Sequence, residues 1–114
     1  MRRSMNIKFK SDKYKRVRGG YSRLLDIQCA NCTKHLFFYQ KDGPGILKRM
    51  YLDRIFESNL YSGLEKKSLK DIPQFICPYC SELLGIPYIY KKEQRLVLRP
   101  LVGGIIKKIV RSSK

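Results

Sequence analysis

The sequence predicts a small β-rich (α+β) domain built around two Cys-x-x-Cys turns, with β-hairpins and a basic extension at each end. Three observations lead to this prediction. The four cysteines fall into two pairs with the same two-residue spacing. Short runs of aromatic and β-branched residues, which favour strands, lie beside these pairs. The 114 residues include 25 Lys or Arg against 9 Asp or Glu, and most of the excess lies near the two ends.

The charge distribution divides the chain into three parts. Residues 1–23 contain nine basic residues and one acidic residue, residues 24–80 contain eight and six, and residues 81–114 contain eight and two. The nearly balanced middle can fold without strong self-repulsion. We therefore expect a basic arm over residues 1–23, a domain over residues 24–100, and a basic tail or short helix over residues 101–114.

The length and composition exclude several classes of protein. A chain of this length is expected to form one small domain, and 43% hydrophobic residues are enough for collapse. No apolar run approaches the roughly 18 to 20 residues that a membrane-spanning helix needs. No apolar stretch typical of a signal peptide follows the basic start. We expect a cytoplasmic location, and an organellar one stays open.

The arm over residues 1–23 has two interpretations. It is either a solvated tail or a segment that follows a phosphate backbone and orders on binding. The rings of Phe9, Tyr14 and Tyr21 stand among its cations. Because such rings can stack on unpaired bases, we favour the second interpretation.

The expected strands begin on either side of the first cysteine pair. Residues 24–28 alternate in part between apolar and polar, and the aromatic run 35–39 favours a second strand. A Gly-Pro-Gly turn follows. Beyond it, residues 46–56 fit either a helical stripe or a hairpin that pairs residues 37–40 with residues 47–52, and we favour the hairpin.

The second half of the chain starts with residues 58–71, which are mostly polar and are expected to form loops. Residues 86–90 and 95–98 are two β-favouring runs with a short polar connection, which predicts a hairpin. Pro87 indicates an edge strand there, because proline cannot donate a ladder hydrogen bond. Pro100 is expected to end the second strand.

Residues 102–111 combine isoleucines and valine with lysines and an arginine. We favour a short amphipathic helix docked on the core. A basic segment that reaches into RNA and a segment that docks on a membrane surface stay open as alternatives.

The cysteine pairs are the strongest signal in the chain. A two-residue spacing lets a tight turn present two sulfurs to one ion, and two such turns complete a tetrahedron. The 44 residues between the pairs add only about 0.8 kcal/mol of loop-closure cost relative to a compact arrangement. Structural zinc contributes on the order of 10 to 16 kcal/mol. We therefore expect a closed, structural zinc site, whose ligands are Cys29, Cys32, Cys77 and Cys80.

Other uses of these cysteines stay open. The cysteines could instead form two structural disulfides or include a thioredoxin-like redox pair. They could also hold iron with the same four thiolates. His35 lies three residues after Cys32 and is a further candidate ligand, although four thiolates make it unnecessary. We otherwise expect His35 on a strand surface.

The two cysteine turns, with the extended segments 34–40, 86–90 and 95–99 after them, resemble the zinc-ribbon family. The resemblance covers residues 24–40 and 74–99. Ribbons typically have glycine after the second cysteine of each turn, where it relieves a positive φ. Here Thr33 and Ser81 occupy these positions. The resemblance implies a zinc-ribbon-like fold and an association with nucleic acid, as in small basic ribosomal proteins.

Catalytic chemistry is not expected from this sequence. The single histidine has no flanking Asp or Ser constellation, and no glycine motif matches a phosphate-cradling loop. The nine acidic residues are scattered rather than grouped as a two-metal nuclease needs. We expect neither an enzyme nor a small-molecule substrate.

We expect a non-catalytic RNA-binding structural protein, most concretely a small zinc-binding ribosomal or ribosome-associated protein. Its partners would be RNA, in particular rRNA, and neighbouring ribosomal proteins, with no membrane partner. A DNA-binding or transcription-associated zinc ribbon and a protein-interaction or redox module are the alternatives. The candidate nucleic-acid contacts are basic residues of the arm, of the expected hairpin tip and of the tail: Arg2, Arg3, Lys8, Lys10, Lys13, Lys15, Arg16, Arg18, Lys91, Lys92, Arg95, Lys107, Lys108 and Arg111.

Overall fold

The computed structural model describes residues 12, 22–43, 45–58, 61 and 64–110. Within these residues the chain forms antiparallel strands and short 3-10 helices, and no α-helix. The strands are β1 (Ser22–Cys29), β2 (His35–Asp42), β3 (Met50–Tyr51), β4 (Ile55–Phe56), β5 (Phe75–Ile76), β6 (Leu83–Tyr90), β7 (Arg95–Pro100) and β8 (Ile105–Ile109). The 3-10 helices are η1 (Leu52–Arg54), η2 (Leu64–Lys66) and η3 (Leu69–Asp71).

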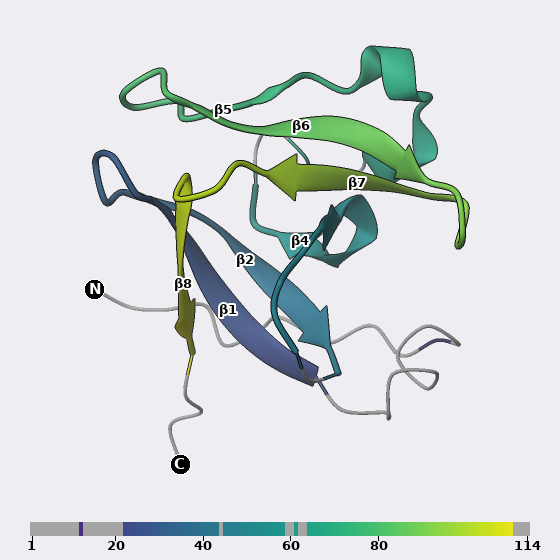
Figure 1. Ribbon diagram of the computed structural model, residues 1–114, viewed down its shortest axis with the longest axis horizontal. Coiled ribbons are helices and arrows are strands. Elements are labelled where there is room, and N and C mark those ends of the chain that lie inside the picture. The colour runs from purple at the N-terminus through teal and green to yellow at the C-terminus, as the bar shows by residue number, and fades with distance from the viewer. Residues whose placement is uncertain (1–11, 13–21, 44, 59–60, 62–63, 111–114) are drawn as a thin grey trace.

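The strands form two four-stranded sheets. The first has the order β4-β2-β1-β8, and the second has the order β3-β7-β6-β5. Figure 1 shows the hairpin of β6 and β7 above the hairpin of β1 and β2. Both hairpins confirm the β-rich, antiparallel fold predicted from the sequence.

The core lies between the two sheets. In β1, Leu25 and Ile27 are buried, and they pair across the sheet with the buried Tyr39 and Phe37 of β2. The Asp26–Phe38 pair between them is buried too, so the centre of this hairpin is covered on both faces. Each fully buried side chain of this size contributes about 1.5–3 kcal/mol.

An aromatic cluster closes the core beside the cysteine turns. Phe37, Tyr61 and Phe75 pack with ring centroids 5.5 to 6.5 Å apart, and the Tyr61 hydroxyl donates to the Pro73 carbonyl at 3.1 Å. Tyr61 belongs to the segment that was expected to form polar loops. That segment also contains η2 and η3, and its Tyr61 and Leu64 pack on the core.

The predicted hairpin between residues 37–40 and 47–52 is wrong. Residues 50–51 form β3, which pairs with β7 of the other sheet, while β2 pairs with β4 instead. The reason is burial: Met50, Leu52 and Ile55 are all buried. The chain therefore joins the second sheet as β3 and returns through η1 to the first sheet as β4.

The predicted helix near the C-terminus is also wrong. Residues 105–109 form β8, which pairs antiparallel with β1 from Leu25↔Ile109 to Cys29↔Ile105. The β-branched residues of this segment favour a strand, and β1 offers it a sheet edge. Backbone bonds extend the pairing at both ends, from the amide of Ala30 to the Gly104 carbonyl and from the amide of Val110 to the Leu24 carbonyl.

The two strand prolines behave as their chemistry requires. Pro87 pairs with Leu98 of β7 on one side, and β5 on the other side of β6 ends its pairing at Gly85. In the described part of the chain, β6 is therefore an edge from residue 86 onward, as Pro87 indicates. Pro100 is the last residue of β7.

A buried polar network joins the sheets at the end remote from the cysteine turns. Arg54 of η1 is fully buried, and its guanidinium contacts Asp42 at 2.9 Å and Asp12 at 2.7 Å. Burial by itself raises the pKa of Asp42, but hydrogen bonds from Ser22, Gln40 and Arg54 outweigh it and leave the pKa below its usual value. Asp12 thus contacts the folded domain through Arg54.

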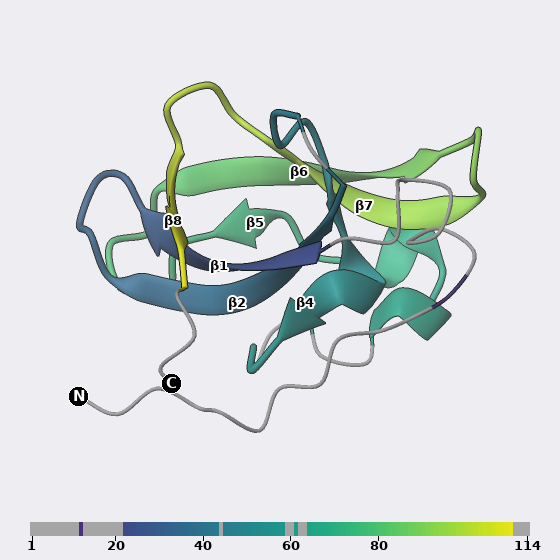
Figure 2. The same cartoon turned by 90° about the horizontal axis from the view of Figure 1, so that it is seen from below.

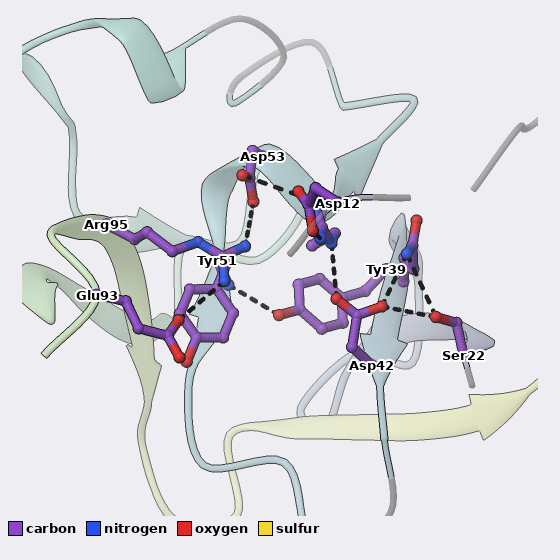
Figure 3. Close-up of polar contacts among 10 residues, drawn as sticks. Asp12, Ser22, Tyr39, Asp42, Tyr51, Asp53, Glu93 and Arg95 are labelled. Atoms are coloured by element: carbon purple, nitrogen blue, oxygen red, sulfur yellow. Dashed lines mark hydrogen bonds and ion pairs between the residues drawn. The ribbon is translucent and has the colours of Figure 1, made fainter. Parts of the chain in front are cut away.

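The same network continues into the second sheet through Asp53. Arg95 of β7 pairs with Asp53 at 2.7 Å and with Glu93 at 3.0 Å (Figure 3). Its guanidinium stacks over the Tyr51 ring at 3.8 Å. The backbone amide of Tyr51 donates to the Tyr39 hydroxyl at 2.8 Å. These contacts hold η1 in place between the two sheets.

Candidate metal centre

The two cysteine turns lie side by side at one end of the molecule. Cys29 ends β1 and Cys32 lies in the turn to β2, while Cys77 and Cys80 lie in the turn between β5 and β6. The four sulfurs lie within 4.8 Å of one another. Both turns appear at the left of Figure 1 and again at the left of Figure 2.

The sulfur positions fit a four-coordinate metal ion. Cys29 Sγ is 3.7 Å from Cys80 Sγ, and Cys32 Sγ is 3.6 Å from Cys77 Sγ. Ligands about 2.3 Å from a tetrahedral zinc ion are about 3.8 Å from each other. A disulfide needs about 2.05 Å, and all four cysteines are free. The group can therefore hold a metal ion, and the alternative of two disulfides is not what the structure contains.

The backbone of the two turns is equivalent. In the first, the amide of Thr33 donates to the Cys29 carbonyl at 2.7 Å; in the second, the amide of Ser81 donates to the Cys77 carbonyl at 2.9 Å. The amide of each leading cysteine also donates to the carbonyl five residues on, at 3.0 and 2.9 Å. Two segments of unrelated sequence thus form the same turn and present their sulfurs in the same way.

Both turns contain a residue in the left-handed region. Thr33 has a φ of 64° and Ser81 a φ of 67°, at the positions where ribbons typically have glycine. A non-glycine residue pays about 1–2 kcal/mol for this conformation. The Thr33 hydroxyl donates to the Cys32 carbonyl at 2.6 Å, which offsets part of that cost.

Hydrogen bonds to the sulfurs favour thiolates. Asn31 Nδ2 donates to Cys80 Sγ at 3.3 Å, and the backbone amide of Tyr79 donates to Cys77 Sγ at 3.4 Å. The Asn31 bond is the largest of the causes that lower the pKa of Cys80 to about 7. The pKa of Cys32 is raised to about 11, because burial and the neighbouring thiols outweigh a hydrogen bond with the Lys34 backbone. A cation among the sulfurs would stabilise their thiolate forms, because it attracts the negative charges that the neighbouring thiols disfavour.

His35 lies outside the cysteine group. Its Nδ1 contacts the buried carboxylate of Asp26 on the adjacent strand. The four sulfurs already form the cluster, and the histidine is half exposed on β2, as expected for a residue on a strand surface.

The expected nucleic-acid contacts have different positions. Lys91 and Lys92 are exposed in the turn between β6 and β7, and Lys107 and Lys108 are exposed on β8. Arg95 is only 8% exposed and is held by two carboxylates, so it does not offer its charge to a partner. The remaining candidates lie outside the described residues: Arg2, Arg3, Lys8, Lys10, Lys13, Lys15, Arg16, Arg18 and Arg111.

Sequence reasoning missed part of the basic surface. Lys48, Arg49 and Arg99 line one cavity together with Lys107, although they are far apart along the chain. The sequence indicates this group only through the adjacent Lys48 and Arg49. The other members come near them only because of how β7 pairs and how the chain runs before β3.

Comparison with known proteins finds no family model, curated protein or solved structure that matches this chain. In the described residues, no helix has the length and apolar character needed to cross a membrane.

Proposed function

We propose that this protein is a zinc-stabilised, zinc-ribbon-like β domain that binds RNA, as a small ribosomal or ribosome-associated protein would. The metal has a structural role, because four thiolates leave no open coordination position for substrate or water. Iron held by the same four thiolates is the alternative, because a tetrahedral four-sulfur site accepts either metal. An absorption spectrum separates the two, since a zinc thiolate site has no visible colour.

The observation that carries the RNA proposal is the way the charges are used. Asp12, Asp42, Asp53 and Glu93 are all paired with two buried arginines. Four of the nine acidic residues are thus paired with the two buried arginines, while most lysines of the described part are exposed. The lysines of the described part therefore present positive charge at the surface, where a polyanion can neutralise it, and the whole sequence carries a net charge of +16.

Sedimentation of tagged full-length protein from cell lysate tests this function. We expect it to migrate with a ribosomal subunit after a high-salt wash and to leave that fraction after RNase treatment. Migration with free protein fractions in both conditions would contradict the proposal. Retention that is sensitive to DNase but not to RNase would favour the DNA-binding alternative.

A further inference from the structure

A groove of about 550 Å³ lies between the segment that precedes β3 and the loop between β7 and β8. Figure 2 shows this loop (yellow) and the segment after β2 on the same side of the molecule. Among the described residues, four basic ones from distant parts of the chain line the groove and no carboxylate does: Lys48, Arg49, Arg99 and Lys107. Like charges gathered around one hollow repel each other, and an anion in it relieves that repulsion.

Arg49 is held in place on the groove wall. Its Nε donates to the Tyr88 hydroxyl at 3.3 Å, and its guanidinium stacks over the Tyr90 ring at 3.9 Å. A planar, preorganised guanidinium suits phosphate oxygens and loses little side-chain entropy on binding. The flanking Lys48, Arg99 and Lys107 are exposed and can adjust to a chain of phosphates.

The rim of the groove carries exposed apolar side chains. Ile46 is 78% exposed, and Val102 is fully exposed. The ring of Tyr88 also lines the groove. A duplex hides the faces of its bases, whereas a single strand exposes them to apolar and aromatic contacts.

We propose that this groove binds the phosphate backbone of a single-stranded RNA segment, with Arg49 as the fixed cation and with bases against the apolar rim. This proposal rests on the RNA-binding function above and names the surface that carries it out.

The test measures binding of a fluorescein-labelled, twelve-nucleotide single-stranded RNA of mixed sequence to the full-length, zinc-loaded protein across a salt series. The groove variant is Lys48→Gln/Arg99→Gln/Lys107→Gln. The matched control, Lys66→Gln/Lys67→Gln/Lys70→Gln, removes the same charge at exposed positions that do not line the groove. All six side chains are exposed, so we expect both variants to fold. Melting temperatures equal to that of the wild type would verify this.

We expect the groove variant to bind at least about tenfold more weakly than the control variant, with a salt slope reduced by about 2, as for three lost phosphate contacts to a single strand. Equal weakening of both variants would overturn the groove while leaving RNA binding intact. Failure of the wild-type protein to bind RNA would overturn the proposed function and the groove with it. Displacement of the RNA by polyglutamate at equal charge concentration would assign the groove to an acidic protein segment instead.

Discussion

Individual residues stabilise this small domain at its two ends. At one end, Asn31 and the backbone of the cysteine turns support the sulfurs. At the other, Arg54 binds Asp42 of β2, and Arg95 binds Asp53 of η1. A buried charge whose partner is removed keeps its desolvation cost and loses the compensating attraction. Substitutions at these residues should therefore have effects much larger than substitutions at the exposed lysines.

Replacing Arg54 with methionine should destabilise the zinc-loaded protein by about 3–5 kcal/mol, because Asp42 would stay buried without its cation. Urea unfolding measures this change. The control Lys66→Met, at an exposed position, should stay within about 0.5 kcal/mol of wild type. Adding Asp42→Asn to Arg54→Met should recover part of the loss, and strictly additive losses would contradict the ion pair.

Asn31→Ala should weaken zinc binding by about 10- to 100-fold, the usual effect of removing a hydrogen bond to a metal ligand. Its amide donates to Cys80 Sγ and lowers the pKa of that thiol. Competition with a chromophoric chelator at neutral pH measures the affinity. Asn31 is exposed, so the loaded variant should keep the wild-type spectrum of β structure. An unchanged zinc affinity would show that the bond does not support the thiolate.

The strands are where sequence reasoning succeeded best, for a local reason. β1, β2, β6 and β7 carry aromatic and β-branched runs beside turns, and each of their hairpins joins neighbours in the sequence. The pairing of β3 was predicted wrongly because its partner, β7, lies far along the chain. Residues 105–109 were predicted as a helix because their isoleucines and lysines fit both a helical and a strand pattern. The open edge of β1 makes them a strand.

Gly85 tests how closely β5, β6 and β7 approach each other. A Cβ on Gly85 would lie 2.9 Å from the Arg99 carbonyl oxygen and 3.2 Å from the Phe75 ring. Gly85→Ala should therefore cost about 1–3 kcal/mol, as overpacking does in well-packed cores. Thermal or urea unfolding measures it against Lys91→Ala in the exposed turn, which should stay within about 0.5 kcal/mol of wild type. Equal stability of the two variants would mean that the strands can separate freely.

The fold of the whole molecule depends on contacts between its two sheets, at the cysteine turns and at the Arg54 and Arg95 network. The cysteine identities and their pairing of turns could be predicted from spacing alone, because the ligand chemistry of sulfur is local. The groove and the burial of Arg95 could not be predicted, because they arise from contacts between the two sheets. A basic residue in the sequence is a surface charge only if the fold leaves it exposed, and Arg95 shows that this can fail.

Metal removal should unfold the domain. A strong chelator under reducing conditions should abolish the β-sheet circular dichroism signal, and an excess of zinc should restore it. Cys77→Ser should have the same effect without chelator, because it removes a buried ligand. A fully folded, metal-free protein with wild-type melting would contradict a structural role for the metal.

The most direct test of the account is zinc-edge X-ray absorption on full-length protein purified under reducing conditions, combined with elemental analysis. The account predicts one zinc ion per chain, bound by four sulfurs at about 2.3 Å. Protein that contains no stoichiometric transition metal, or a zinc shell with oxygen or nitrogen in place of sulfur, would contradict it.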